Sequence, residues 1–135
     1  MEARKVMFSC GGRGLLASAM LLAGVVSYVQ AAEPPKVAET PKGPALADSR
    51  GMTLYTFDKD SDGKSACTGK CAENWPPLMA DPTASAPAGY ATVAREDGGK
   101  QWAYKGKPLY GWVKDAKPGD TTGDGVNGSW HIARP

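Results

Sequence analysis

Histidine and cysteine are scarce in this sequence, which has one of the first and three of the second. The sequence shows no recognisable nucleophile for which the single histidine, His131, could act as a base, so a nucleophile–histidine pair is not indicated. The chain beyond residue 31 also lacks a G-x-S-x-G sequence and a phosphate-binding glycine loop. With no catalytic pattern to build on, we expect a protein that is not an enzyme.

Long hydrophobic runs are also absent. The longest, residues 15–29, falls short of the roughly 20 residues needed to span a bilayer. Basic residues precede the run, and Val29 and Ala31 supply the small side chains that signal peptidase requires. We therefore predict a Sec-type signal peptide over 1–31 and a periplasmic or secreted protein; an uncleaved N-terminal anchor is the alternative. Cys10 precedes the run, so the chain has no lipobox cysteine.

Charge of one sign is not in excess once this segment is removed. Cleavage takes away three of the 16 basic residues and one of the 14 acidic residues, which leaves 13 of each. The formal charge of +2 therefore belongs to the precursor alone. We expect no nucleic-acid partner and no membrane span after cleavage. We expect a monomer that binds an unknown envelope ligand or protein.

Two cysteines, Cys67 and Cys71, remain in a chain sent to an oxidising compartment, and an even number there favours a disulfide. The closed loop is short, so chain entropy gives it only about 2 kcal/mol. Three residues separate the pair, whereas a thioredoxin-like redox pair has two. Copper or zinc held by the two thiols, His131 and either Met52 or Met79 is the alternative.

One stretch of the chain occurs twice. Residues 51–80 reappear 55 positions later as residues 106–135. Seven identical or similar pairs share this register: Gly51/Gly106, Leu54/Leu109, Tyr55/Tyr110, Phe57/Trp112, Lys59/Lys114, Asp60/Asp115 and Trp75/Trp130. We interpret the repetition as an internal duplication. The repeated aromatic residues fit a pseudo-symmetric core better than an aromatic binding surface, which remains the alternative.

Sequence patterns typical of β-strands predominate in the chain beyond the predicted signal peptide. Residues 90–95 and 100–104 flank Asp97-Gly98-Gly99, which is typical of a hairpin turn. Residues 66–74 are compatible with one short helix, which the prolines after Trp75 end. The sequence predicts a mainly β, small single domain of short antiparallel strands over 45–135, with copy one at 51–80, copy two at 106–135 and hairpin 90–104 between them. The Pro/Lys/Glu-rich residues 32–44 predict a disordered spacer.

The carboxylates of Asp58, Asp60 and Asp62 alternate before Gly63, as in the first half of a calcium-binding loop. Gly69 stands where the loop's last, bidentate Glu would be, so an EF-hand is excluded. A weaker calcium-type site that also uses Asp115 is one hypothesis. A turn in which the Asp side chains bond their own backbone is the other.

These residues resemble a bacterial family described as a secreted repeat of unknown function, predicted lipoproteins with a Y-x-(F/W/Y)-x-x-D motif. The motif stands twice, as Tyr55, Phe57, Asp60 and as Tyr110, Trp112, Asp115. The resemblance covers the chain from about Ala45 onward and implies an envelope location and this fold type. It implies no activity, catalytic residues or cofactor. The family is often lipid-anchored, and this chain departs from it by lacking the anchoring cysteine.

Overall fold

Eight short strands make up most of the regular structure in residues 33–135, which are the residues that the computed structural model describes. The predicted signal peptide over 1–31 lies outside the described residues. The strands are β1 (Lys36–Thr40), β2 (Gly43–Ala47), β3 (Tyr55–Phe57), β4 (Met79–Ala80), β5 (Tyr90–Ala94), β6 (Lys100–Tyr104), β7 (Lys107–Pro108) and β8 (Trp130–Ile132). One helix, α1 (Lys70–Asn74), and one 3-10 turn, η1 (Val126–Gly128), complete the set. The mainly β prediction is confirmed.

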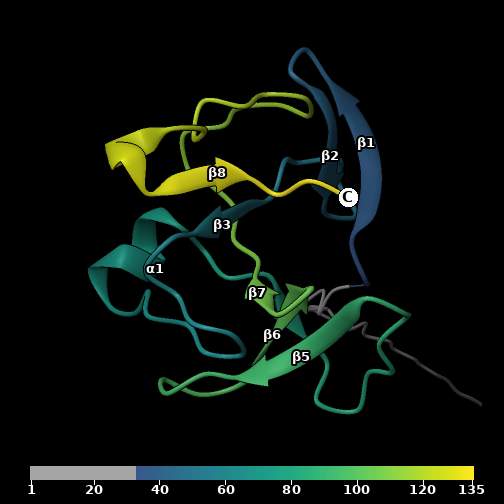
Figure 1. Ribbon diagram of the computed structural model, residues 1–135, viewed down its shortest axis with the longest axis vertical. Coiled ribbons are helices and arrows are strands. Elements are labelled where there is room, and N and C mark those ends of the chain that lie inside the picture. Colours follow the sequence, from purple (N-terminus) through teal and green to yellow (C-terminus); the bar gives the residue numbers. More distant parts are fainter. Residues whose placement is uncertain (1–32) are drawn as a thin grey trace, which may run out of the picture.

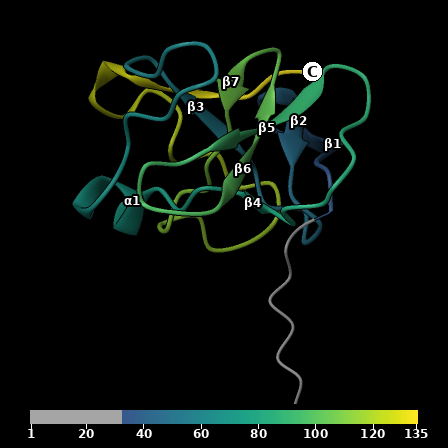
Figure 2. The same ribbon diagram turned by 90° about the horizontal axis from the view of Figure 1, so that it is seen from below.

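The strands form three small antiparallel sheets. β1 pairs with β2, β3 pairs with β8, and β6 lies between β4 and β5 with β7 also paired to it. Figure 1 shows the green sheet at the bottom of the view and the β1–β2 hairpin at the upper right. In both views α1 lies on the opposite side of the molecule from β1 and β2 (Figures 1 and 2). None of the helices in residues 33–135 has the length and apolar character that a membrane span requires.

The prediction of a disordered spacer over 32–44 is wrong, because these residues contain β1 and the start of β2. Most of β1 is exposed, so its polar composition gave no sign of a strand. Its order comes from backbone pairing with β2, whose Ala45, Leu46 and Ala47 are buried. The turn between β1 and β2, residues 40–43, does have a sequence typical of a β-turn. Pro41 is the second and Gly43 the fourth of its four residues. The Thr40 hydroxyl closes it by donating to the Gly43 carbonyl at 2.7 Å.

The β1–β2 hairpin is the counterpart of the β5–β6 hairpin, so hairpin 90–104 belongs to the second copy rather than lying between two copies. A ring of three backbone hydrogen bonds shows the equivalence. Leu46 N–H donates to the Ala133 carbonyl (2.8 Å), Ala133 N–H to that of Leu54 (2.9 Å), and Leu54 N–H to that of Leu46 (2.9 Å). The other copy forms the same ring from Leu78, Trp102 and Leu109. Each ring contains one residue from the other copy, so the copies are interlocked.

The predicted helix is shorter than its pattern, beginning at Lys70 rather than near residue 66. Gly69 has a φ of 60°, which sets the point where helical geometry can begin. The buried core falls into two clusters. One surrounds the aromatic residues of the repeat, and the other surrounds Leu46, Leu54, Trp102 and Leu109. The first cluster lies where the two copies meet.

Candidate functional site

The repeated motif joins one copy to the other. The Tyr55 hydroxyl donates to Asp115 Oδ2 at 2.6 Å, and the Tyr110 hydroxyl donates to Asp60 Oδ2 at 2.7 Å. The two tyrosines also exchange backbone hydrogen bonds, at 2.8 and 3.0 Å. Each tyrosine therefore bonds the carboxylate of the opposite copy across an approximate two-fold relation.

The second oxygen of each motif carboxylate is also engaged. Asp60 Oδ1 accepts the Ala66 N–H at 2.6 Å, and Asp115 Oδ1 accepts both the N–H and the hydroxyl of Thr122 at 2.9 and 2.6 Å. Burial raises the pKa of Asp60 above its ordinary range, against the lowering effect of these hydrogen bonds. The carboxylates are thus used within the fold.

Four aromatic residues of the repeat, two of them from the motif, form a column of stacked rings. Phe57 stacks on Trp130 at a centroid distance of 4.2 Å, and Trp130 stacks on Trp75 at 3.7 Å with planes 1° apart. Trp75 stacks in turn on Trp112 at 3.9 Å. Ring stacking adds roughly 0.5–1.5 kcal/mol per pair beyond burial. Trp75 and Trp130 are 4% and 2% exposed, which places the middle of the column in the core.

Three of the predicted calcium ligands, Asp58, Asp60 and Asp62, line one hollow, and Asp115 lies elsewhere. Asp58 Oδ2 lies 2.8 Å from His131 Nε2, and Asp60 and Asp115 are held by different tyrosines. Asp62 packs against Gly106. Residues 33–135 contain no group of three or more His, Cys, Asp or Glu side chains arranged to hold a metal ion. The calcium hypothesis therefore gains no support from the geometry.

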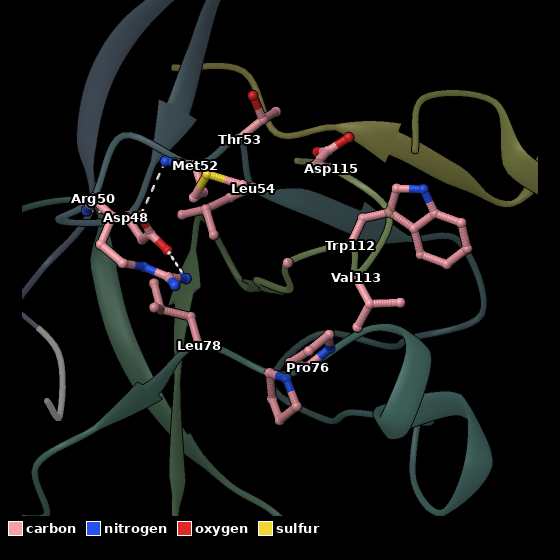
Figure 3. A pocket seen from close by; sticks show the side chains of 12 residues that line it. Asp48, Arg50, Met52, Thr53, Leu54, Pro76, Leu78, Trp112, Val113 and Asp115 are labelled. Carbon is pink, nitrogen blue, oxygen red and sulfur yellow. Dashed lines mark hydrogen bonds and ion pairs between the residues drawn. The ribbon is translucent and has the colours of Figure 1, made fainter. Parts of the chain in front are cut away.

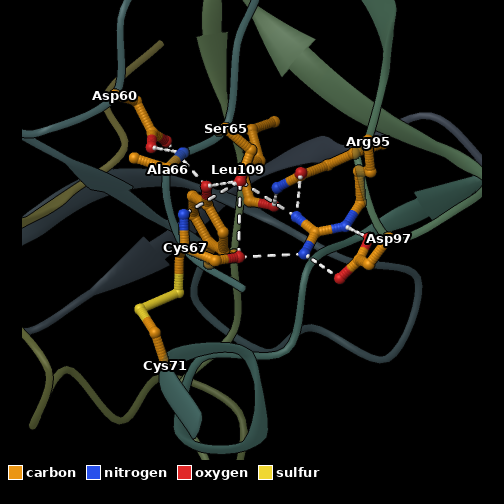
Figure 4. The surroundings of a disulfide bond; sticks show 10 residues. Asp60, Ser65, Ala66, Cys67, Cys71, Arg95, Asp97 and Leu109 are labelled. Carbon is orange, nitrogen blue, oxygen red and sulfur yellow. Dashed lines mark hydrogen bonds and ion pairs between the residues drawn. A yellow bond between two sulfur atoms is a disulfide. The ribbon is translucent and has the colours of Figure 1, made fainter. Parts of the chain in front are cut away.

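Cys67 and Cys71 form a disulfide, so the predicted bond is present (Figure 4). The copper or zinc hypothesis required both thiols to be free. The disulfide packs against the aromatic cluster, with Cys67 fully buried and Cys71 half-buried.

Arg95 is the structural residue that sequence reasoning missed. Its guanidinium, 1% exposed, bonds both carboxylate oxygens of Asp97, the Gln101 side-chain oxygen, Ser65 Oγ and the Cys67 carbonyl at 2.7–3.0 Å (Figure 4). The hydrogen bond to Asp97 and the charge of that carboxylate raise the pKa of Arg95, against the lowering effect of burial. An arginine next to a hairpin turn gives no sequence signal for such a role, because Ser65 and Cys67, which it joins to the hairpin, are 30 and 28 residues away.

Two clefts on the surface occupy equivalent places in the two copies. The first cleft, of about 330 Å³, lies along residues 50–54 and 76–78 and is shown in Figure 3. The second cleft, of about 280 Å³, lies along residues 104–109 and 131–134. Positions 55 residues apart line both: Arg50/Lys105, Met52/Lys107, Leu54/Leu109, Pro76/His131, Leu78/Ala133 and Val113/Asp58. The duplication therefore built the same hollow twice.

The linings of the two clefts have diverged. In the first cleft, Arg50 donates to Asp48 Oδ2 at 2.8 Å, which balances the only cation in its lining. Figure 3 shows this pair at one side and Trp112 with Val113 at the other. The second cleft is lined by Lys105, Lys107 and Arg134, with Asp58 paired to His131. Sequence reasoning missed the cationic cleft, although its residues stand close together at 105–107 and 131–134.

Comparison with known families gives a match in both copies. Residues 36–79 and residues 91–134 each match the model of a family described as a secreted repeat of unknown function. The two matched segments begin 55 residues apart, at β1 and within β5, so each includes a hairpin. No curated protein and no solved structure matches the chain.

Proposed function

The chain belongs to the family of secreted repeats of unknown function, and we propose that it is a non-enzymatic, disulfide-stapled binding domain of the bacterial cell envelope that holds an anionic ligand in its second cleft. We further propose that it acts as a monomer in the periplasm or outside the cell. The cationic lining of the second cleft is the observation that carries the binding proposal.

Lys105, Lys107 and Arg134 make no ion pair within the described part of the chain. Lys105 instead lies over the Tyr104 ring, 5.1 Å from its centroid, and Arg134 donates to the Pro44 carbonyl at 2.7 Å. Asp58 is the one carboxylate in this lining, so the three cations give the hollow, with its low-dielectric walls, a net positive potential. The chain without its predicted signal peptide is formally neutral, so this cleft is a local feature rather than a reflection of overall charge.

The floor of the second cleft is apolar. Leu109, Ile132 and Ala133 line it and are 5% exposed or less. Ligand sites commonly combine an apolar lining with a few placed polar groups. We therefore propose a ligand that has an apolar face and one or more phosphate or carboxylate groups.

The pair of His131 and Asp58 supports binding rather than catalysis. Its side chains are 49% and 55% exposed, so neither has the water-excluded setting from which electrostatic catalysis draws its strength. The alternative of a small metal-binding protein has no specific observation in its favour, because the candidate carboxylates within residues 33–135 form no group arranged to hold a metal ion and the cysteines are joined.

Titration with phenyl phosphate tests the proposal, because this probe has both an apolar ring and a dianion. We expect Lys107→Met/Arg134→Met to weaken binding by roughly tenfold or more, since about 1.4 kcal/mol corresponds to a factor of ten. Methionine stands at both equivalent positions of the first copy, Met52 and Met79, so the substitutions suit this fold. We also expect added salt to weaken wild-type binding, because exposed charges are screened.

Arg50→Met, in the first cleft, is the matched control and should leave the affinity unchanged. Phenol and inorganic phosphate, used as separate probes, report the apolar and anionic parts of the interaction. A wild-type protein that binds phenyl phosphate no better than phenol, or a double variant that binds as wild type does, would overturn the proposal and leave a structural domain.

A further inference from the structure

A third hollow, of about 290 Å³, opens at the Phe57 end of the aromatic column; we call it the column-end pocket. Phe57, Trp75 and Trp130 line it. Phe57 is half-buried and stacks on Trp130 through one face. Its other face has no ring partner among the described residues, so Phe57 is the terminal ring of the column, and the pocket lies beside it.

Polar groups that can both donate and accept hydrogen bonds surround this aromatic wall. Asn74 and Asn127 contribute side-chain amides that have no hydrogen-bond partner within residues 33–135, and Ser129 contributes a hydroxyl. The backbone beside them is already engaged, because the Asn74 carbonyl accepts the Val113 N–H and the Ser129 carbonyl accepts the Asp58 N–H, at 3.1 and 2.8 Å. The backbone at Asn74 and Ser129 is therefore satisfied within the fold, and the exposed side-chain amides of Asn74 and Asn127 are available to a ligand.

Asn127 occupies the left-handed region, with φ at 54°. Asparagine tolerates this conformation better than most residues, but it still carries some cost. The conformation interrupts the helical geometry of η1 at the residue that lines the pocket. A local cost of this kind is found repeatedly where a fold positions a group for binding.

The pocket is also cationic. Lys59 and Lys70 line it, and neither ammonium forms an ion pair or hydrogen bond within the part of the chain that the structure describes. No Asp or Glu is among the lining residues. An aromatic wall, unused amides, a hydroxyl and two unpaired ammonium groups therefore converge on one hollow.

We propose that the column-end pocket binds an anionic sugar residue. The C–H face of a pyranose packs against an aromatic surface, while its hydroxyls require neighbours that both donate and accept. The ammonium groups of Lys59 and Lys70 supply three donors each to a carboxylate or phosphate on the sugar. The volume is near the lower end for small-molecule sites and fits a single sugar unit.

This site is independent of the second cleft. The hollow that adjoins both is lined by Asp58, Asp60 and Asp62. It shares Phe57 with the column-end pocket and Thr56, Asp58 and Lys107 with the second cleft. An acidic surface between two cationic ones disfavours one continuous anionic chain across both. The two sites can therefore be tested separately.

Titration with glucuronate, followed through the indole N–H signals of Trp75 and Trp130 in two-dimensional NMR, tests the proposal. We expect glucuronate to shift these signals and to bind more tightly than either glucose or acetate. Lys59→Gln/Lys70→Gln should weaken binding by roughly fivefold, because two exposed charge contacts together contribute about 1 kcal/mol. Both lysines are exposed, so the variant should fold.

Lys114→Gln is the matched control, because Lys114 is the equivalent of Lys59 in the second copy and lies over Trp112, 5.8 Å from the ring centroid. It should leave glucuronate binding unchanged, and so should Lys107→Met/Arg134→Met in the second cleft. Glucose 6-phosphate is a further probe. Comparing its affinity with that of glucuronate shows whether the pocket prefers a phosphate or a carboxylate.

Equal affinity for acetate would reduce the site to simple anion binding, and equal affinity for glucose would remove the role of the lysines. Either result would overturn the proposal, as would glucuronate and glucose 6-phosphate both leaving the indole signals unmoved. Loss of phenyl phosphate binding alone would count against the second cleft and leave the column-end pocket untouched.

Discussion

The first and second clefts are the same hollow built by two copies of one motif, yet they present different chemistry. At three equivalent positions the first cleft has the apolar Met52, Pro76 and Val113, where the second has the ionisable Lys107, His131 and Asp58. By contrast, the motif residues between the copies keep the same roles on both sides. The fold depends on the contacts between the copies, so the cleft linings were free to change without loss of the core.

The largest effect is expected where the two copies are most alike. Trp75→Ala and Trp130→Ala should each lower the free energy of unfolding by about 3–5 kcal/mol, because each removes a buried inner ring of the column. Trp112→Ala, at the half-buried end, should cost less. Urea unfolding measures all three. A large difference between the two inner variants would show that the copies do not share the core equally.

Removal of the tyrosine hydroxyls tests the contact between copies. Tyr55→Phe should destabilise the fold by about 1.5–3 kcal/mol, because it leaves the buried carboxylate of Asp115 without this donor. Tyr110→Phe should act similarly through Asp60. The double variant reports whether the two bonds are coupled. Full stability in either single variant would contradict the interlocking role of the motif.

The same tyrosines predict an alkaline limit to stability. Burial raises the pKa of both Tyr55 and Tyr110 above the ordinary value of 10.0. The folded protein then retains protons that the unfolded chain releases above pH 10.0. The contribution of these two tyrosines to stability is therefore fully present below that pH and falls as pH rises beyond it. Urea unfolding across this range should show the decline in wild type and a weaker one in Tyr55→Phe/Tyr110→Phe.

The disulfide is a covalent difference between the copies. Thr122 and Val126 stand at the positions equivalent to Cys67 and Cys71, so only the first copy is stapled. Reductant should lower wild-type stability by about 2 kcal/mol. Cys67→Ala/Cys71→Ala should have this lower stability already and should not respond to reductant. A wild-type thermal melt that is unchanged in reductant would show that the first copy does not need its staple.

Thr53 offers the smallest expected change. Its hydroxyl is buried without a hydrogen-bond partner in the described residues, and the equivalent position in the second copy is the apolar Pro108. Thr53→Val should raise stability by about 1 kcal/mol, because valine has nearly the same shape as threonine and lacks the unsatisfied hydroxyl. Thr56→Val, at a half-buried strand position, is the control and should change stability by less than about 0.5 kcal/mol. A loss of stability in Thr53→Val would show that the hydroxyl has a partner.

Much of the fold could be predicted because its signals are local or repeated. Alternating residues and the Asp97-Gly98-Gly99 turn specified the β5–β6 hairpin, and the cysteine count specified the disulfide. β1 was missed because its side chains bury little and its order depends on its partner strand. The prediction of a cation site at Asp58, Asp60 and Asp62 gained no support, for a related reason. Each carboxylate has a neighbour from elsewhere in the chain, and sequence spacing cannot show such neighbours.

The sequence by itself determined the duplication, the strand-rich class and the disulfide, because each follows from residue spacing and chain chemistry. Only the tertiary structure decided that each motif tyrosine bonds the carboxylate of the opposite copy, because that pairing joins residues 50 to 60 positions apart. It also decided that Lys105, Lys107 and Arg134 share a cleft while Lys59 and Lys70 share another. Charges act on a ligand through their distances in space, and the interlocked copies set those distances.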